Sequence, residues 1–120
     1  MKIYLAGPMR GIPNFNFPAF DYAAAKLRAQ GFEVFSPAER DRAAYGSEIE
    51  HNPTGDARKV TNPACTINDC MAADCEWICR NANGIALLPG WEKSSGANAE
   101  WALARALGLS VLHLGKEYVQ

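Results

Sequence analysis

The chain has 120 residues, of which 48% are hydrophobic and 21% are charged, and its formal net charge is −1. This length predicts one domain, residues 1–120, and the composition is typical of a globular protein. The small net charge argues against nucleic-acid polymers and membranes as partners, and no apolar run approaches about 20 residues. Because the first residues do not form a signal peptide, we expect a cytoplasmic protein.

Four cysteines lie close together in the sequence, at Cys65, Cys70, Cys75 and Cys79. They include no tight Cys-x-x-Cys pair, and on a helix Cys70 would point away from Cys79 at about 100° per residue. We therefore expect no metal site, and we expect reduced, mostly buried thiols.

Apolar runs and helical repeats alternate along the chain. Turn residues divide them from one another, which sets the boundaries of the predicted elements. Strands are predicted at residues 2–6, 32–35, 85–88 and 109–114, and helices at 16–31, 66–80 and 95–107. This alternation predicts a parallel sheet of four or five strands with helices on both faces, a flavodoxin-like or Rossmann-like three-layer α/β/α fold.

Two local features of the first half carry further expectations. Asn16 is expected to cap the first helix, with Pro18 in its first turn. Residues 38–63 are polar and are interrupted by glycine and proline, which predicts a long loop that is helical in part around residues 40–45. A loop of this length is usually a lid or a binding loop.

The loops after the first and third strands are expected to meet at one edge of the sheet, where the strand order changes. The first loop offers a guanidinium, and the second begins a helix whose backbone N–H groups suit a phosphate. A plain strand-to-helix turn remains the alternative for the first loop. The candidate phosphate-binding residues are Gly7, Pro8, Met9, Arg10, Gly11, Ser94, Ser95 and Gly96.

Glu100 lies one turn inside the helix that begins near Ser95, about 5–6 Å along its axis. That spacing matches the reach from a 5′-phosphate to the anomeric carbon of a ribose. The alternative is that Glu100 is an ordinary exposed residue on the helix surface. Asp74 interrupts an apolar helix face, where an acidic residue is either paired or functional. Tyr4 is expected either to orient Glu100 or to pack in the core, and Trp91 either to stack on a base or to cover the helix start.

Three segments together resemble the nucleoside 2-deoxyribosyltransferase family. Tyr4-Leu-Ala-Gly-Pro8 is similar to that family's first strand and loop, and Asp74-Cys-Glu-Trp-Ile78 is similar to its helix with a functional aspartate. The segment Ser94-Ser-Gly-Ala-Asn-Ala-Glu100 resembles the part that carries the nucleophile. The Gly7-Pro-Met-Arg-Gly11 loop is closer to the 2′-deoxynucleoside 5′-phosphate N-hydrolases, and Leu88-Pro-Gly-Trp-Glu-Lys-Ser94 resembles a small bacterial and phage-associated subgroup.

The resemblance implies a retaining displacement at C1′ of a nucleoside or nucleotide. Glu100 would be the nucleophile, Asp74 would help the base to leave, and Tyr4 would hold Glu100 in line. It also implies no metal or organic cofactor, and a homodimer or higher homo-oligomer in which a neighbouring subunit completes the site. The family usually has an aspartate where this chain has Asn83, which removes a carboxylate expected near the base side or the strand end.

Two other functions remain open from the sequence. A nucleotide-binding or sensing module would keep the phosphate loop without turnover; Asn83 favours it, and the joint presence of Tyr4, Asp74 and Glu100 opposes it. A phosphoribohydrolase of the cytokinin-activating type also uses a glycine-rich helix start and a glutamate. This chain lacks the Pro-Gly-Gly-x-Gly-Thr run of that type.

Overall fold

The computed structural model describes residues 1–46, 51–56 and 67–119. Its centre is a parallel sheet of four strands in the order β2-β1-β3-β4. The strands are β1 (Lys2–Ala6), β2 (Glu33–Phe35), β3 (Gly84–Leu87) and β4 (Ser110–His113). The predicted three-layer α/β architecture is thereby confirmed, with four strands among the described residues.

β1 lies between β2 and β3, with Tyr4 in register with Phe35 on one side and Ile85 on the other. The chain therefore moves from β1 toward one edge of the sheet through β2, and from β3 toward the other edge through β4. The strand order changes between β1 and β3. Loops that follow these two strands border the crevice in which open α/β sheets bind their ligands.

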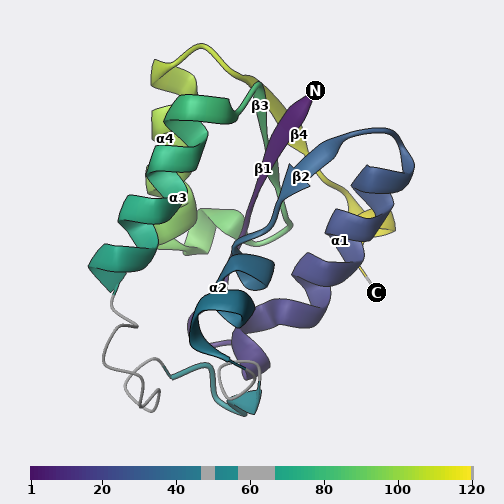
Figure 1. Cartoon of the computed structure of the whole chain (residues 1–120). Helices are drawn as coiled ribbons and strands as arrows, with labels where there is room; N and C mark the ends of the chain where they lie inside the picture. Colours follow the sequence, from purple (N-terminus) through teal and green to yellow (C-terminus); the bar gives the residue numbers. More distant parts are fainter. Residues whose placement is uncertain (47–50, 57–66, 120) are drawn as a thin grey trace.

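The helices form the two outer layers (Figure 1). α1 (Phe17–Ala29) covers one face of the sheet, and α3 (Ile67–Asn81) and α4 (Ser95–Ala106) cover the other. α2 (Pro37–Tyr45) follows β2 and lies at the end of the sheet where the strands terminate. Every helix in the described part of the chain is too short or too polar to cross a membrane.

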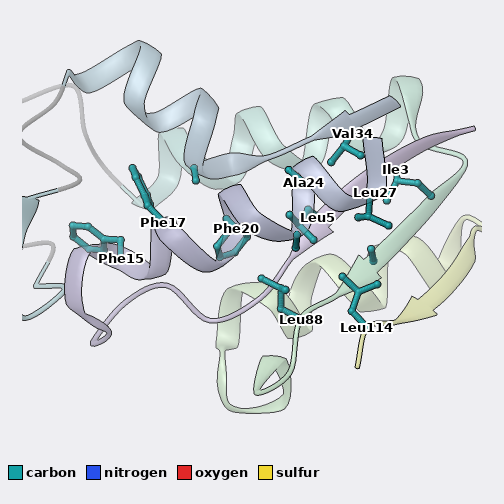
Figure 2. Close-up of a cluster of buried hydrophobic side chains, with 13 residues drawn as sticks. Ile3, Leu5, Phe15, Phe17, Phe20, Ala24, Leu27, Val34, Leu88 and Leu114 are labelled. Carbon is teal, nitrogen blue, oxygen red and sulfur yellow. The ribbon is translucent and has the colours of Figure 1, made fainter. Parts of the chain in front are cut away.

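Alternation along β1 supplies both cores, because successive strand residues point to opposite faces. Ile3 and Leu5 pack under α1 with Phe20 and Leu27, as Figure 2 shows. Tyr4 and its neighbours on the opposite face pack under α3 and α4. The residues of that second core are Tyr4, Ala6, Ile78, Ile85, Leu87, Ala97 and Ala104.

The segment predicted as a loop from residue 38 begins with a helix instead. Pro37 is in the first turn of α2, a position where its missing N–H costs nothing, and the helix continues to Tyr45. The helix predicted around residues 40–45 was therefore too short, because α2 begins earlier, at Pro37. Of the remainder of the predicted loop, residues 46 and 51–56 are described, and residues 47–50 and 57–63 lie outside the described residues.

A left-handed turn precedes α1. Asn14, Phe15 and Asn16 all have positive φ angles, of 56°, 52° and 62°. Asn16 occupies the position before the helix, as predicted, but its side chain does not cap the helix and instead donates a hydrogen bond to Pro8 O at 2.9 Å. The expected side-chain cap was wrong because the left-handed backbone turns this amide toward the loop after β1.

The three described cysteines, Cys70, Cys75 and Cys79, form no disulfide with one another. Cys70 and Cys75 are half-buried and Cys79 is exposed, so the expectation of mostly buried thiols was wrong for this helix. All three lie on α3, of which only one side faces the sheet. Cys65 lies outside the described residues.

Candidate active site

A cavity of about 700 Å³ opens at the carboxyl ends of β1 and β3. This is the position expected for ligands in an open parallel sheet, and the volume is within the range of small-molecule sites. Acidic groups and cations are both found in the cavity wall. We call the part of the wall formed by Tyr4, Asp41, Asp74 and Glu100 the acidic part. The cationic part contains Arg10 and Lys93, with Ser94 and Ser95 beside them.

The Tyr4 hydroxyl donates a hydrogen bond of 2.7 Å to Glu100 Oε2. Tyr4 points from β1 toward α4, and Glu100 lies on the second turn of α4 facing the sheet. Ala97 and Ala104 lie one turn before and after Glu100 on the same helix face and are buried, so α4 packs closely against β1. Because Glu100 is only 6% exposed and Tyr4 is fully buried, the surface alternative for Glu100 is excluded.

The protein shifts the ionisation of this pair strongly. Burial raises the pKa of Glu100 to about 8, opposed by the hydrogen bond from Tyr4 and reinforced by the nearby charge of Asp74. Burial and the Glu100 charge also raise the pKa of Tyr4 well above its ordinary value. In this environment Glu100 holds a proton at neutral pH and becomes a carboxylate as the pH approaches about 8.

Asp74, on α3, is held by a guanidinium from α2. Arg40 Nη2 lies 3.2 Å from Asp74 Oδ1 and 2.8 Å from Asp41 Oδ1, so one nitrogen contacts two carboxyl groups. Asp74 is 6% exposed and Asp41 is 7% exposed. Burial raises the pKa of Asp41 to about 6 and also raises that of Asp74, while Arg40 opposes both changes.

Sequence reasoning missed Arg40 and Asp41. They lie in a polar segment with no apolar repeat, and the signal that would have found them is their place after Pro37, at the carboxyl end of β2. Arg40 and Asp41 begin the second turn of a helix at the same sheet edge as the other candidate residues.

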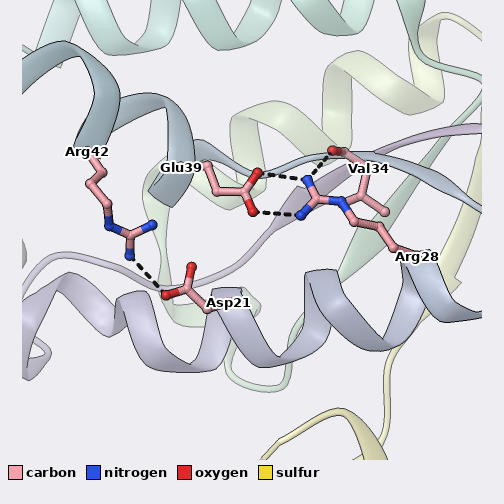
Figure 3. A network of polar contacts seen from close by, with 5 residues as sticks. All are labelled: Asp21, Arg28, Val34, Glu39 and Arg42. Atoms are coloured by element: carbon pink, nitrogen blue, oxygen red, sulfur yellow. Dashed lines mark hydrogen bonds and ion pairs between the residues drawn. The ribbon is translucent and has the colours of Figure 1, made fainter.

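Two ion pairs fasten α2 to α1 (Figure 3). Arg28 on α1 binds both carboxylate oxygens of Glu39, at 2.6 and 2.7 Å, and Arg42 on α2 binds Asp21 at 2.9 Å. A bidentate guanidinium–carboxylate pair fixes direction as well as distance. These contacts therefore set the angle at which α2 presents its acidic residue to the cavity.

The predicted phosphate loops are neighbours and both line the cavity. Gly7, Pro8, Met9 and Arg10 come from the first loop, and Ser94, Ser95 and Gly96 from the second. A side chain at Gly7 would place its Cβ 2.8 Å from Leu88 Cβ, so the close approach of the two loops requires glycine there. Sequence reasoning missed Lys93, whose signal is its position directly before the Ser-Ser helix start.

Ser94 has a structural role that sequence reasoning did not assign. Its Oγ accepts a hydrogen bond from Ala97 N at 3.1 Å and thereby caps α4. The helix start thus faces the cavity with one of its free N–H groups already satisfied. The others remain suited to an anion, together with the guanidinium of Arg10.

The structure places Asn83 away from the cavity. Asn83 precedes β3, and its side-chain oxygen accepts a hydrogen bond from Lys2 N at 2.8 Å at the amino end of β1. The site is at the opposite, carboxyl end of these strands. The expectation that Asn83 lies on the base side was therefore wrong.

Two further candidates also lie outside the cavity wall. Trp91 packs against Trp101 and His113, with ring centroids 5.3 and 6.1 Å apart, and so covers the α4 start rather than facing a ligand. Gly11 N donates a hydrogen bond to Gly55 O at 2.9 Å, and its φ of 79° requires a residue that tolerates left-handed backbone. Gly11 therefore shapes the end of the first loop instead of contacting a ligand.

Comparison with known proteins identifies one relationship. A search of the curated proteins and a search of the solved structures each find no match. Residues 1–113 match the family model of DUF4406, a domain of unknown function. The matched segment includes Tyr4, Asp74 and Glu100 and nearly the whole chain, so this protein belongs to the DUF4406 family.

Proposed function

We propose that the protein cleaves the N-glycosidic bond of nucleoside or deoxynucleoside 5′-monophosphates, with Glu100 as the nucleophile. One observation carries the proposal: the buried Glu100 carboxyl, held by the Tyr4 hydroxyl at 2.7 Å, shares a cavity with two cations and a helix start. The acidic part suits an electrophilic sugar carbon, and the cationic part suits the phosphate on the same sugar.

The two parts of the cavity correspond to the two ends of the substrate. Arg10, Lys93 and the α4 start would bind the 5′-phosphate, which fixes the sugar and lowers the entropy cost of the reaction. Glu100 lies one turn beyond that helix start. Its carboxylate would then face C1′, the only carbon of the sugar that carries a leaving base.

The reaction proceeds by two displacements at C1′. Glu100 forms an ester bond to C1′ while the bond to the base nitrogen breaks and the base leaves with that electron pair. Water, or a second base, then attacks C1′ and restores the Glu100 carboxylate. Tyr4 keeps the attacking oxygen in line, and Asp74 helps the base to leave. None of these steps requires a metal or an organic cofactor.

The resemblance described above supports two further parts of the proposal. It points to deoxyribose as the preferred sugar and to a homodimer in which the partner subunit completes the site. Sedimentation of the purified protein tests the second point, because a monomer at micromolar concentration would contradict it.

A substrate panel tests the proposed reaction. Wild type and the exposed-site control Glu76→Ala are expected to release free base from deoxynucleoside 5′-monophosphates, whereas Glu100→Ala is expected to release none. A sugar phosphate bound as an ester to the peptide that contains Glu100 would be visible by mass spectrometry. Nucleotide binding by wild type without any base release would reject the enzyme and favour a nucleotide-binding module. Formation of a new nucleotide when a second base is added distinguishes transfer from hydrolysis.

A further inference from the structure

Asp41 and Asp74 both lie against the guanidinium of Arg40, but the hydrogen bonding of the two carboxyl groups differs. Asp74 Oδ1 accepts a hydrogen bond from Arg40 Nη2 at 3.2 Å, and Tyr4 favours the same charged form of Asp74. Asp41 Oδ1 lies 2.8 Å from the same nitrogen, yet within the described part of the chain it receives no hydrogen bond. Asp74 is therefore the better stabilised carboxylate of the two.

Asp41 also faces the same cavity as the proposed nucleophile. Both side chains are at least nine-tenths buried and both line the cavity wall, but they come from different helices. The two ion pairs between α1 and α2 hold the Asp41 helix in place (Figure 3). A second carboxyl group held at a fixed angle to the first is the arrangement that glycosidic bond cleavage uses, with one group at the sugar and one at the leaving group.

The charges around Asp41 favour a retained proton. Arg40 of α2 supplies one positive charge. It interacts electrostatically with three carboxyl groups, those of Asp41, Asp74 of α3 and Glu100 of α4. Tyr4 and Cys70 are the other titratable groups of this part of the cavity. Three carboxyl groups around one half-buried cation cannot all ionise cheaply. Burial raises the pKa of Asp41 to about 6 and that of Glu100 to about 8, so the reactive form, with Asp41 protonated and Glu100 ionised, is the less populated singly ionised form of the pair.

We propose that Asp41, and not Asp74, is the proton donor to the leaving base, and that Asp74 assists only as a positioning residue that acts through Arg40. The inference rests on the proposed function and names the acid of that reaction. As the C1′–N bond breaks, its electron pair goes to the base nitrogen, and the Asp41 proton neutralises the base. In the second step the Asp41 carboxylate takes a proton from the attacking water while the bond between C1′ and Glu100 breaks.

Two substrates with different leaving groups test this assignment. One is a deoxynucleoside 5′-monophosphate, whose base needs a proton, and the other is the nitrophenyl glycoside of the same sugar phosphate, which leaves as a stable anion. Asp41→Asn is expected to lower kcat/KM, which reports the first step alone, by about 10²- to 10⁴-fold on the nucleotide, the usual contribution of a general acid, and by less than about tenfold on the nitrophenyl glycoside. Asp74→Asn is expected to lower both by a similar factor.

The pH profile supplies a readout that a structural role would not change. On the nucleotide, the reactive form of wild type has Glu100 ionised and Asp41 protonated. Because the pKa of Asp41 is about 6 and that of Glu100 about 8, the rate is expected to rise to about pH 6, stay level, and fall above about pH 8. Asp41→Asn should lose the alkaline fall. Its rise should continue beyond pH 6 toward the pKa of Glu100, because loss of the Asp41 proton then no longer limits the rate. Equal losses on both substrates, or an unchanged alkaline fall, would overturn the assignment.

The design separates this inference from the proposed function. If wild type releases neither base nor nitrophenolate, the proposed function fails, and the assignment of Asp41 fails with it. If wild type releases both and Asp41→Asn loses both equally, only the assignment of Asp41 fails. Should Asp41→Asn not fold, Asp41→Ala with added formate replaces it: recovery of base release supports the assignment, and no recovery contradicts it. Glu76→Gln, on the exposed side of α3, is the matched control.

Discussion

Because Glu100 binds a proton in the folded protein, the free energy of unfolding should depend on pH. The substitution Glu100→Gln should remove the part of that dependence that comes from Glu100. The pKa of this carboxyl rises from an ordinary 4.5 to about 8 on folding, chiefly because it is buried. A raised pKa means that the folded state binds the proton more tightly than the unfolded state. The resulting stabilisation is complete below about pH 4.5 and is lost as the pH rises to about 8.

The size of this effect follows from the two pKa values. Each pKa unit corresponds to about 1.4 kcal/mol, so between pH 5 and pH 8 the ionisation of Glu100 should cost on the order of 3 kcal/mol of unfolding free energy. Glu100→Gln keeps an oxygen that accepts the Tyr4 hydrogen bond and has no proton to lose. Relative to wild type, it should therefore gain about that much stability between pH 5 and pH 8.

Urea denaturation of both proteins at several pH values measures this difference. Other groups titrate in both proteins and largely cancel in the comparison, and Glu76→Gln on the exposed side of α3 should follow wild type at every pH. A difference between Glu100→Gln and wild type that stays constant from pH 5 to pH 8 would refute the reasoning. It would mean that Glu100 is already a carboxylate in the folded protein at pH 5.

Three further substitutions test separate parts of the site. Tyr4→Phe removes a buried hydrogen bond to Glu100 and should lower kcat about 10- to 100-fold with little change in KM. Because that bond lowers the pKa of Glu100, its loss should also move the alkaline limb of the pH–rate profile to higher pH. Arg10→Ala should lower kcat/KM on 5′-monophosphates at least about tenfold more than on nucleosides, with the exposed Arg80→Ala as control; equal losses would show that Arg10 does not contact phosphate. Ser94→Ala removes the cap of α4 and should cost about 1 kcal/mol in urea denaturation, and an unchanged midpoint would show that this cap adds no stability.

The sequence predicts the sheet well and α2 poorly, for one physical reason. β1 and β3 are short runs that are apolar on both faces, so burial alone marks them to within one residue. α2 has no such signal, because ion pairs hold it against α1 where most helices would use an apolar stripe. Patterns of hydrophobicity therefore locate the strands and overlook a polar helix.

The same difference explains which site residues were found. Tyr4 and Glu100 follow from the general rule that ligands bind at the carboxyl ends of parallel strands, and the structure joins them by a hydrogen bond. The presence of Arg40 and Asp41 at the site depends on the position of α2, which the sequence did not predict. Asn83 was misplaced because it was assigned by resemblance alone, although a residue directly before a strand lies at the amino end of the sheet.

The left-handed turn before α1 limits how this segment can vary among related chains. Three successive residues other than glycine, at positions 14 to 16, adopt positive φ, which asparagine tolerates better than most residues and β-branched residues tolerate poorly. A relative that folds in the same way should therefore carry asparagine, aspartate or glycine at positions 14 and 16, and avoid valine, isoleucine and threonine there. This rule predicts a signature for the family just beyond the loop after β1, independent of any residue proposed to react, and an alignment with β-branched residues at positions 14 and 16 would contradict it.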